Sequence, residues 1–478
     1  MRILLVGNPR TVMGFNRLTK IPSLNLASIA ANLDEGLAEV KIADLVIKDR
    51  NPKKALQTIL EDYKPDVVGF TAMSFQYNMA LELAKLTRKL LPNAINILGG
   101  YHATGDSENI VISDDMDYFN FLINGEGETP FNELIKALGN GHDFSKVPSI
   151  SYKENGKAIH NPRPLKLLEP EDIRLPLRSA RIYQKGFHIL GMPGDVIETS
   201  RGCVYTCNFC SIRNMYGRSF RKFSIDRIID DLEDAKRYGT EAIFITDDNI
   251  TIDPKRLIKL SDEITHNKLN MTFAVQANVR GFRKNPELAP AMARAGTKMV
   301  FLGIENASDD NLEFMHKSNQ LTTSDTEIVV KQLKENKILV VGGFIFGNPD
   351  DKKEDLVKNF DYAKKIGVDF QLFNILTPHL KTELREELLK EGLVTNIDDY
   401  SKYNHYAANV KTRHLSTEEL FKIRNKLDAR YTIESGAIFR LFRAYPWYFT
   451  KLMFWMMRYE PQNWYNFVTG TLGKNKVK

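Results

Sequence analysis

Short apolar runs alternate with amphipathic segments along the first part of the chain. Residues 66–71 (DVVGFT) form a continuous apolar run bounded by Pro65 and polar positions, as expected for a strand that is buried on both faces. Further strands are expected at residues 2–6, 40–43, 94–98 and 119–123, and helices between them at residues 24–33, 53–61, 79–90 and 129–138. This alternation predicts an α/β domain over residues 1–142, built on a doubly wound parallel sheet.

The ends of these expected strands carry turns rich in glycine and hydroxyl residues, at residues 7–9, 71–74, 99–104 and 125–128. In a doubly wound sheet, ligands bind in the crevice outside the carboxyl ends of the strands. We therefore expect one ligand site at this edge of a Rossmann-like domain. The motif G-x-G-x-x-G, which is typical of a dinucleotide site, is absent after the first strand.

A second α/β series follows a connector over residues 143–194, which is rich in proline and short polar turns. Strands are expected at residues 196–200, 242–246, 271–275, 299–303, 339–346 and 370–375, with helices such as 225–238, 254–266 and 355–366. Six such units predict a partial (β/α)6 barrel over residues 195–412, whose active site lies at the C-terminal mouth of the strands. Residues 413–478 are expected to be helical and to end in an aromatic, basic tail.

Charge and hydropathy exclude two classes of protein. The 66 Lys and Arg against 60 Asp and Glu give a net charge of +6, which is mild for this length and does not indicate nucleic acid binding. No stretch reaches the ~18 apolar residues of a membrane span. The N-terminal apolar run is too short for a secretory signal, so we expect a cytoplasmic protein.

All three cysteines of the chain lie in one short segment. Cys203, Cys207 and Cys210 form a C-x3-C-x2-C motif directly after the expected strand 196–200. A secreted disulfide framework would spread an even number of cysteines along the chain, whereas an odd cluster suggests ligands for a soft metal. Three thiolates can bind three irons of a 4Fe–4S cubane and leave the fourth iron open to a substrate. The alternatives are a zinc site, for which no nearby histidine offers a fourth ligand, and three buried structural thiols.

The segment Arg201-Gly202-Cys203 to Cys210, with the aromatic Phe209 before the third cysteine, resembles the motif of the radical S-adenosylmethionine (SAM) superfamily. Residues 1–410 resemble its cobalamin-dependent, class B methyltransferase-like branch. The resemblance implies that the cluster cleaves SAM reductively to a 5′-deoxyadenosyl radical, which removes hydrogen from an unactivated carbon. It also implies a low-potential electron donor such as a flavodoxin or a ferredoxin.

The resemblance assigns SAM contacts to the barrel strand ends. Residues 247–249 take the place of a small-residue-plus-Glu motif that holds the methionine amino group, but its Gly-Gly pair is absent, so the sequence leaves open which carboxylate does this. The residues implied to contact SAM are Phe209, Asp247, Asp248, Asn249, Gln276, Asn278, Glu305, Phe344 and Ile345. Each of them could instead be a helix cap or a loop hydrogen bond, Asn249 and Asp253 especially.

The first domain resembles the cobalamin-binding domain of the same branch. The residues implied to contact cobalamin are Thr71, Ser74, Gly99, Gly100, His102, Gly125 and Glu126. The Asp-x-His-x-x-Gly motif that supplies a cobalt-ligating histidine in other cobalamin proteins is absent, and His102 is not assigned to cobalt. A Rossmann-like domain that binds a nucleotide, or nothing, is the alternative.

The C-terminal tail has two interpretations. Residues 439–467 are rich in aromatic residues and Met with interleaved Lys and Arg, and contain all three tryptophans, Trp447, Trp455 and Trp464. The segment suits a helix in a membrane interface, and thus a peripheral membrane contact and a lipid-like substrate, but equally a helix that caps the barrel. Pro446 and Pro461 are expected to divide it.

Three functions are compatible with these features. The first is cobalamin-dependent methylation of a carbon or phosphorus centre of a small-molecule substrate, in which methylcobalamin supplies the methyl group. The second is a cobalamin-linked cyclisation or rearrangement without methyl transfer. The third is a non-enzymatic iron–sulfur or cobalamin sensor, which would lack the polar residues at the barrel strand ends. Methylation is the more common activity in the branch and leads among the three.

Overall fold

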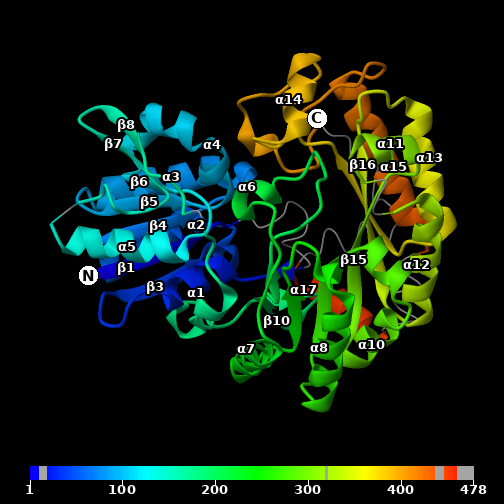
Figure 1. The fold of residues 1–478 in the computed structure, drawn as a ribbon, viewed down its shortest axis with the longest axis horizontal. Helices are drawn as coiled ribbons and strands as arrows, with labels where there is room; N and C mark the ends of the chain where they lie inside the picture. The colour runs from blue at the N-terminus through cyan, green and yellow to red at the C-terminus, as the bar shows by residue number, and fades with distance from the viewer. Residues whose placement is uncertain (10–18, 142, 165, 318–320, 437–445, 460–478) are drawn as a thin grey trace.

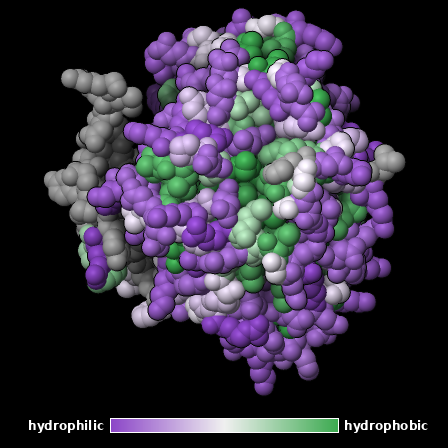
Figure 2. Space-filling model, turned by 90° about the vertical axis from the view of Figure 1, so that its left-hand side faces the viewer, coloured by the Kyte–Doolittle hydropathy of each residue, from purple (hydrophilic) through white to green (hydrophobic). Residues whose placement is uncertain are grey.

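The computed structural model consists of two α/β domains that lie side by side, with the short helix α6 (Ile212–Tyr216) between them (Figure 1). The structure describes residues 1–9, 19–141, 143–164, 166–317, 321–436 and 446–459. Most of the outer face of the N-terminal domain is hydrophilic, with an apolar area near its middle (Figure 2).

The N-terminal sheet has the order β3-β1-β4-β5-β6-β7-β8. Its first five members pair in parallel: β3 (Glu39–Asp44), β1 (Arg2–Gly7), β4 (Val67–Thr71), β5 (Ile95–Gly99) and β6 (Phe121–Ile123). The chain enters the sheet at β1 and turns back between β1 and β4, so the ligand crevice of a doubly wound sheet lies at the carboxyl ends of these two strands. The predicted parallel doubly wound sheet is confirmed.

Helices cover both faces of this sheet, since its central strands carry apolar side chains on both faces and these must be shielded from water. One apolar cluster joins Ile3 and Leu5 to helices α1 (Leu24–Ala31) and α5 (Glu128–Gly139). The other joins Leu4 and Val6 to helices of the opposite face, which are α2 (Pro52–Tyr63), α3 (Tyr77–Leu90) and α4 (Tyr101–Ile112). Successive residues of β1 therefore point to opposite cores, as the strand period of two requires.

The segment predicted as a connector contributes structure to both domains. Its hairpin, β7 (Ile150–Glu154) and β8 (Lys157–His160), extends the first sheet antiparallel to β6. Further along, Arg178 is buried and ion-paired at 2.6–2.9 Å to Asp195, Asp231 and Asp234. These carboxylates belong to the first strand and first helix of the second domain, so the connector is fixed to the barrel.

The second sheet has the order β17-β16-β15-β14-β13-β10-β9-β2. Six strands are parallel: β10 (Met192–Ile197), β13 (Ala242–Ile245), β14 (Thr272–Asn278), β15 (Thr297–Glu305), β16 (Leu339–Phe346) and β17 (Phe370–Ile375). This confirms the predicted six-stranded partial barrel. Two short antiparallel strands complete its edge, β9 (His188–Ile189) and β2 (Thr19–Lys20), of which β2 comes from the first domain.

One large apolar core lies between the barrel strands and their outer helices. These helices are α7 (Ile225–Arg237), α8 (Pro254–His266), α9 (Val279–Lys284), α10 (Leu288–Ala295), α11 (Asp309–Phe314), α12 (Thr323–Glu335) and α13 (Lys353–Ile366). In β15, Val300, Leu302 and Ile304 are buried in this core, whereas Phe301, Gly303 and Glu305 are partly accessible. The alternate residues therefore line the barrel interior, where the predicted cofactor contacts belong.

The C-terminal region contains α14 (Glu383–Lys390), α15 (Thr417–Glu434) and α17 (Pro446–Tyr459). Pro446 is the first residue of α17, a position in which proline is well tolerated. Among the described helices, none combines the length and apolar character needed to cross a membrane. The expectations for residues 437–445 and 460–478, including Trp464 and Pro461, fall outside the described residues.

Candidate functional site

The cysteine loop lies between β11 (Ser200–Arg201) and α6, at the carboxyl end of β10. Its entry depends on Gly202, which has a φ of +86°. A Cβ at this position would lie 2.5 Å from the carbonyl oxygen of Ser219. Only glycine fits this turn, which brings the cysteines over the barrel mouth.

The three thiols are half-buried, and none forms a disulfide. The pKa of Cys210 is raised to about 12, chiefly by burial and in smaller part by the neighbouring Cys207, Asp248 and Cys203. The thiols therefore lie within electrostatic reach of one another. In the ranges that the structure describes, no three Cys, His, Asp or Glu side chains are gathered in the geometry of a metal site. The chemistry of the donor set, three soft thiols on one loop, fits a 4Fe–4S cluster.

A buried ion pair faces the cysteine loop from the barrel. Lys317 Nζ lies 2.7 Å from Glu305 Oε1 at the end of β15, and Cys207 and Cys210 are among the groups that raise the pKa of Lys317. Glu305 has a φ of +64°, where a β-bulge in the pairing with β16 turns its side chain into the mouth. Glu305 was among the site residues expected from the sequence, but Lys317 was not. No local motif marks Lys317, because it meets Glu305 only in the folded chain.

The structure separates the roles of the three residues after β13. Asp247 is buried and accepts hydrogen bonds from Thr199 N and Oγ1, both at 2.6 Å, and from Ser200 Oγ at 2.5 Å, so its carboxylate fastens the chain before the cysteine loop. Asn249 is buried and caps Thr251 N at 3.1 Å, which corrects its expected role as a cofactor contact.

Asp248, in contrast, is partly accessible and close to the cysteines. Burial raises its pKa to about 7, with the Asp247 carboxylate as the next cause. Of the two aspartates that the sequence could not distinguish, Asp248 is the one that faces the site.

The expected SAM contacts on β14 and β16 differ in how accessible they are. Gln276 is partly accessible on the inner face, whereas Asn278 is buried and caps α9 by accepting from Arg280 N at 2.8 Å. Ile345 lines the interior, but the adjacent Phe344 is fully buried in the outer core, 5.5 Å from Phe373. Neighbouring residues of a strand point to opposite faces, so the inclusion of Phe344 is corrected. Phe209 is partly buried against the barrel core.

Several of the expected cobalamin contacts gather at the carboxyl edge of the first sheet. Thr71 ends β4, and Gly99 ends the neighbouring β5. Gly100 has a φ of +95°, and a Cβ there would lie 2.8 Å from the carbonyl oxygen of Ala72. Glycine thus brings the two strand ends close together, and the chemistry of this small-residue edge fits a large planar ligand.

His102 does not belong to this accessible edge. Its ring is fully buried between Tyr77 and Tyr400, at centroid distances of 4.1 and 4.6 Å, and Nδ1 lies 3.4 Å from Ser74 Oγ. Burial lowers the pKa of His102 to about 3. A ring without exposed surface cannot contact a ligand, which corrects the inclusion of His102 among the cofactor contacts.

The turn after β6 joins the two domains. Glu126 and Glu128 lie 2.8 and 2.7 Å from the guanidinium of Arg201, which directly precedes the cysteine loop, and Glu126 also pairs with Arg221 at 3.0 Å. Glu198 completes the contacts of Arg201 at 2.7 Å. Glu126 was expected to contact cobalamin, but its carboxylate is occupied by arginines. Gly125 beside it has a φ of +85° and donates its N–H to Thr104 Oγ1 at 2.9 Å.

Tyr101 is a second link between the domains that the sequence did not reveal. It begins α4 directly after Gly100 and is partly accessible. Burial raises its pKa, followed by Tyr216, Asp248 and Cys210, so its phenol lies beside the cysteine loop. The edge of the first domain and the mouth of the barrel therefore adjoin each other.

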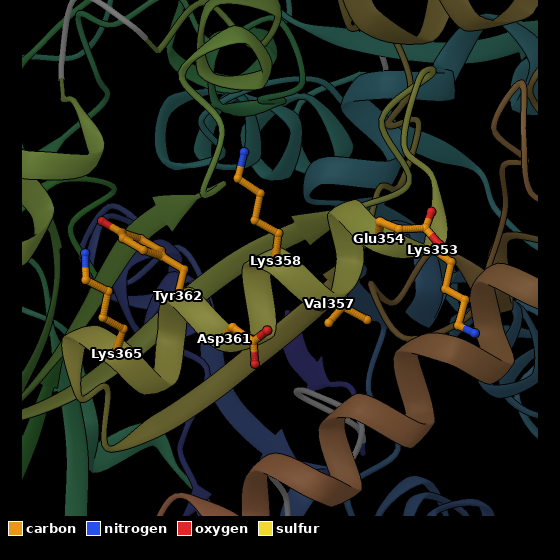
Figure 3. A pocket seen from close by; sticks show the side chains of 7 residues that line it. All are labelled: Lys353, Glu354, Val357, Lys358, Asp361, Tyr362 and Lys365. Carbon is orange, nitrogen blue, oxygen red and sulfur yellow. The ribbon is translucent and has the colours of Figure 1, made fainter.

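A hollow elsewhere on the surface has a different character (Figure 3). Its lining, which includes Lys353, Asp361 and Tyr362, comes from α13 alone. It lies on the outer surface of a barrel helix, so it is unrelated to the junction of the two domains.

Comparisons with known proteins agree with this geometry. A family model described as "Radical SAM superfamily" matches residues 197–389, and one described as "B12 binding domain" matches residues 10–135. An uncharacterized methyltransferase of Pyrococcus horikoshii is 32% identical over 430 residues, 89% of this chain and 91% of that protein. A bacteriochlorophyllide d C-12(1)-methyltransferase of Chlorobaculum tepidum is 28% identical over 83% of this chain and 82% of that protein.

The solved structure of the radical SAM methyltransferase TsrM from Kitasatospora setae, with cobalamin and a 4Fe–4S cluster bound, has the same fold. Its TM-score is 0.68 at 19% identity, over 83% of this chain and 76% of that chain. Together with the two family models, these relatives confirm the predicted enzyme class and its cofactors, a 4Fe–4S cluster, SAM and cobalamin. The chain belongs to the cobalamin-dependent, methyltransferase-like branch of the radical SAM superfamily.

Proposed function

We propose that the protein transfers a methyl group to an unactivated carbon or phosphorus centre of a small, apolar molecule. The observation that carries the proposal is the junction at Arg201, where the glutamates of the first domain's ligand edge contact the residue before the cysteine loop. When bound, the cofactors supply the radical that activates the substrate and the methyl group that it receives. The residues of this chain hold the two cofactor sites together and keep them fixed.

Mass analysis of the product tests the reaction type. The full chain is reconstituted with iron, sulfide and cobalamin under anaerobic conditions and given SAM, a strong reductant and candidate acceptors. We expect an acceptor that gains one methylene in mass, together with 5′-deoxyadenosine. A product that has only lost hydrogen would support the cyclisation alternative instead.

We assign the SAM contacts to the accessible members of the predicted set. Asp248 beside the cysteines is placed to receive the methionine ammonium group, while Gln276 and Ile345 line the inner face for the ribose and the adenine. Glu305 is paired with Lys317, so this pair offers a polar surface rather than a free carboxylate. The accessibility of these side chains at successive strand ends of the barrel supports the proposed roles.

Asp248→Asn is expected to weaken SAM binding at least about tenfold, because a hydrogen bond to a charged group contributes about 1.5–3 kcal/mol. Equilibrium dialysis of SAM against the reconstituted protein measures the affinity. The iron content of the variant is expected to equal that of the wild type. Asp247→Asn is the matched comparison: it loses the hydrogen bonds of Thr199 and Ser200 and is expected to lower the unfolding temperature. Equal SAM affinity in Asp248→Asn and the wild type would contradict the assignment.

We further propose that α17 contacts a membrane surface, which suits a lipid-like acceptor. Trp447 and Phe454 are 67% and 61% exposed on this helix, and the exposed Arg458 adds a positive charge. Replacing both aromatic residues by serine is expected to reduce cosedimentation with phosphatidylglycerol vesicles severalfold. Ile112→Ser, which removes an equally exposed apolar side chain from α4, serves as the control. Unchanged sedimentation of the double variant would argue against this contact.

Reduction of the cluster requires an external electron, and we propose a flavodoxin or a ferredoxin as its source. Bleaching of the cluster's absorbance by a reduced flavodoxin checks this. Bleaching only by dithionite would point to another donor.

A further inference from the structure

Two histidines meet at the mouth of the barrel outside the contacts assigned above. His379 follows β17, and His405 lies after the turn Tyr400–Lys402, with ring centroids 5.0 Å apart in an edge-to-face arrangement. The backbone of His405 holds this position: its carbonyl oxygen accepts from Ile375 N at 2.7 Å, and its φ is +66°. The pair is therefore built into the end of the sixth barrel strand.

Neither imidazole has a hydrogen-bond partner within the described part of the chain. His379 is partly accessible and His405 is exposed, yet the surrounding protein lowers the pKa of His379 to about 3 and that of His405 to about 4. The two rings are uncharged at neutral pH, and each offers one N–H donor that is not used by the protein. An accessible polar pair whose N–H groups the protein leaves unused suits a ligand with acceptor atoms.

A buried positive charge lies beside the pair. Arg385 is 6% exposed and donates from Nη1 to Pro378 O at 2.9 Å and to Tyr403 OH at 2.7 Å. It forms no ion pair within the described residues, unlike Arg178 and Arg201, which each contact three carboxylates. The local potential is therefore positive, and Arg385 contributes to the lowered pKa of His379.

The segment that carries these groups is attached to the cysteine loop. Leu384 N donates to Asn208 O at 3.1 Å, and Asn214 Nδ2 donates to Leu380 O at 2.9 Å. The inner face of the barrel carries the aromatic pair Phe244 and Phe301, with ring centroids 5.8 Å apart, and Ile345, beside the polar Gln276. The barrel thus offers apolar side chains on its inner face, and the two histidines and Arg385 follow its last strand.

We propose that His379, His405 and Arg385 form an oxyanion-binding end of the methyl-acceptor site, so that the acceptor is an apolar molecule with an acidic group. The inference rests on the proposed function. The two neutral imidazole N–H groups can donate to the lone pairs of a carboxylate or a phosphate, and the positive charge of the Arg385 guanidinium complements its negative charge. The apolar body of the acceptor lies in the barrel, within reach of the cofactor sites.

Ligand binding to the full reconstituted chain, measured by anaerobic titration calorimetry without SAM, tests the proposal. The probes are decanoate, decyl phosphate and decanol, which share an apolar chain. We expect at least one of the two anions to bind at least about tenfold more tightly than decanol, and the stronger of them identifies the acidic group.

Two variants locate the binding. His379→Phe keeps the ring volume, and His405→Asn keeps a residue that tolerates a positive φ; each is expected to remove most of the preference for the anion. The control is His266→Asn, at the exposed end of α8, which is expected to retain it. The cobalamin content and unfolding temperature of each variant verify folding.

Equal binding of all three probes, no binding of either anion, or a preference that survives in both variants would overturn the proposal. Because SAM is absent, a failure of methyl transfer in the product assay leaves this measurement unaffected. Conversely, a methylated product from an uncharged acceptor would support methyl transfer while removing the need for an oxyanion site.

Discussion

Cys203→Ala is expected to reduce bound iron from about four per chain to background and to abolish 5′-deoxyadenosine formation. The chain contains only three cysteines, and all three lie on the loop between β11 and α6. A cubane held by three thiolates has no replacement ligand when one is removed. Iron analysis, the visible spectrum and chromatography of the nucleoside products check this result.

The same variant contains its own control. The B12-binding domain matches residues 10–135, which do not include the cysteine loop, so Cys203→Ala is expected to bind cobalamin as the wild type does. Iron content and deoxyadenosine at wild-type levels would contradict the assignment of Cys203 as a ligand. Loss of cobalamin together with iron would indicate that the whole junction had unfolded.

Arg201→Met is expected to destabilise the protein by about 3–5 kcal/mol, as found when one partner of a buried ion pair is removed. Glu126, Glu128 and Glu198 would then remain in a largely buried site without their shared guanidinium. Urea unfolding at neutral pH measures the loss. Arg237→Ala, which removes an exposed pair with Asp234 at 2.9 Å, is expected to cost less than about 1 kcal/mol.

The pH dependence of Arg201→Met gives a second test. In the wild type the pKa of Glu128 is lowered: burial alone would raise it, but Arg201 and the hydrogen bonds outweigh this. That stabilising contribution is present above the carboxyl's unfolded pKa and is lost as the pH falls through the folded pKa. In the variant the same carboxyl is buried without its cation, so its pKa rises above the unfolded value. The deficit of Arg201→Met relative to the wild type is therefore expected to shrink between about pH 7 and about pH 5; a constant deficit would contradict this explanation.

The sequence predicted the parts of the site that depend on local pattern. Gly202 and the cysteines form a contiguous motif, and apolar runs located both sheets, because strand burial is visible in short windows. Strand parity was also available: Phe344 and Ile345 are neighbours, so only one of them can face the interior. Which of the two faces the outer core could not be read from the sequence, because β16 is apolar on both faces.

Contacts between distant residues were beyond prediction from one sequence. Arg201 meets Glu126 across 75 positions, and Tyr101 joins the cysteine loop only because the two domains pack together. The residues after β13 were ambiguous for a related reason. Asp247 and Asp248 are chemically identical, and their roles differ only through the direction in which the strand presents them.

The strand β2 has a consequence for how the chain is made. Thr19 and Lys20 are synthesised before most of the first sheet, but Ile189 and His188, with which they pair, follow only after the whole first sheet. The edge of the barrel is thus completed by β2, which cannot pair until β9 has been synthesised. Pairings of such long sequence separation form slowly, because the intervening loop must first be closed. The two domains are therefore expected to mature as one unit, and a gene fragment that begins after β2 would produce a barrel with an open edge.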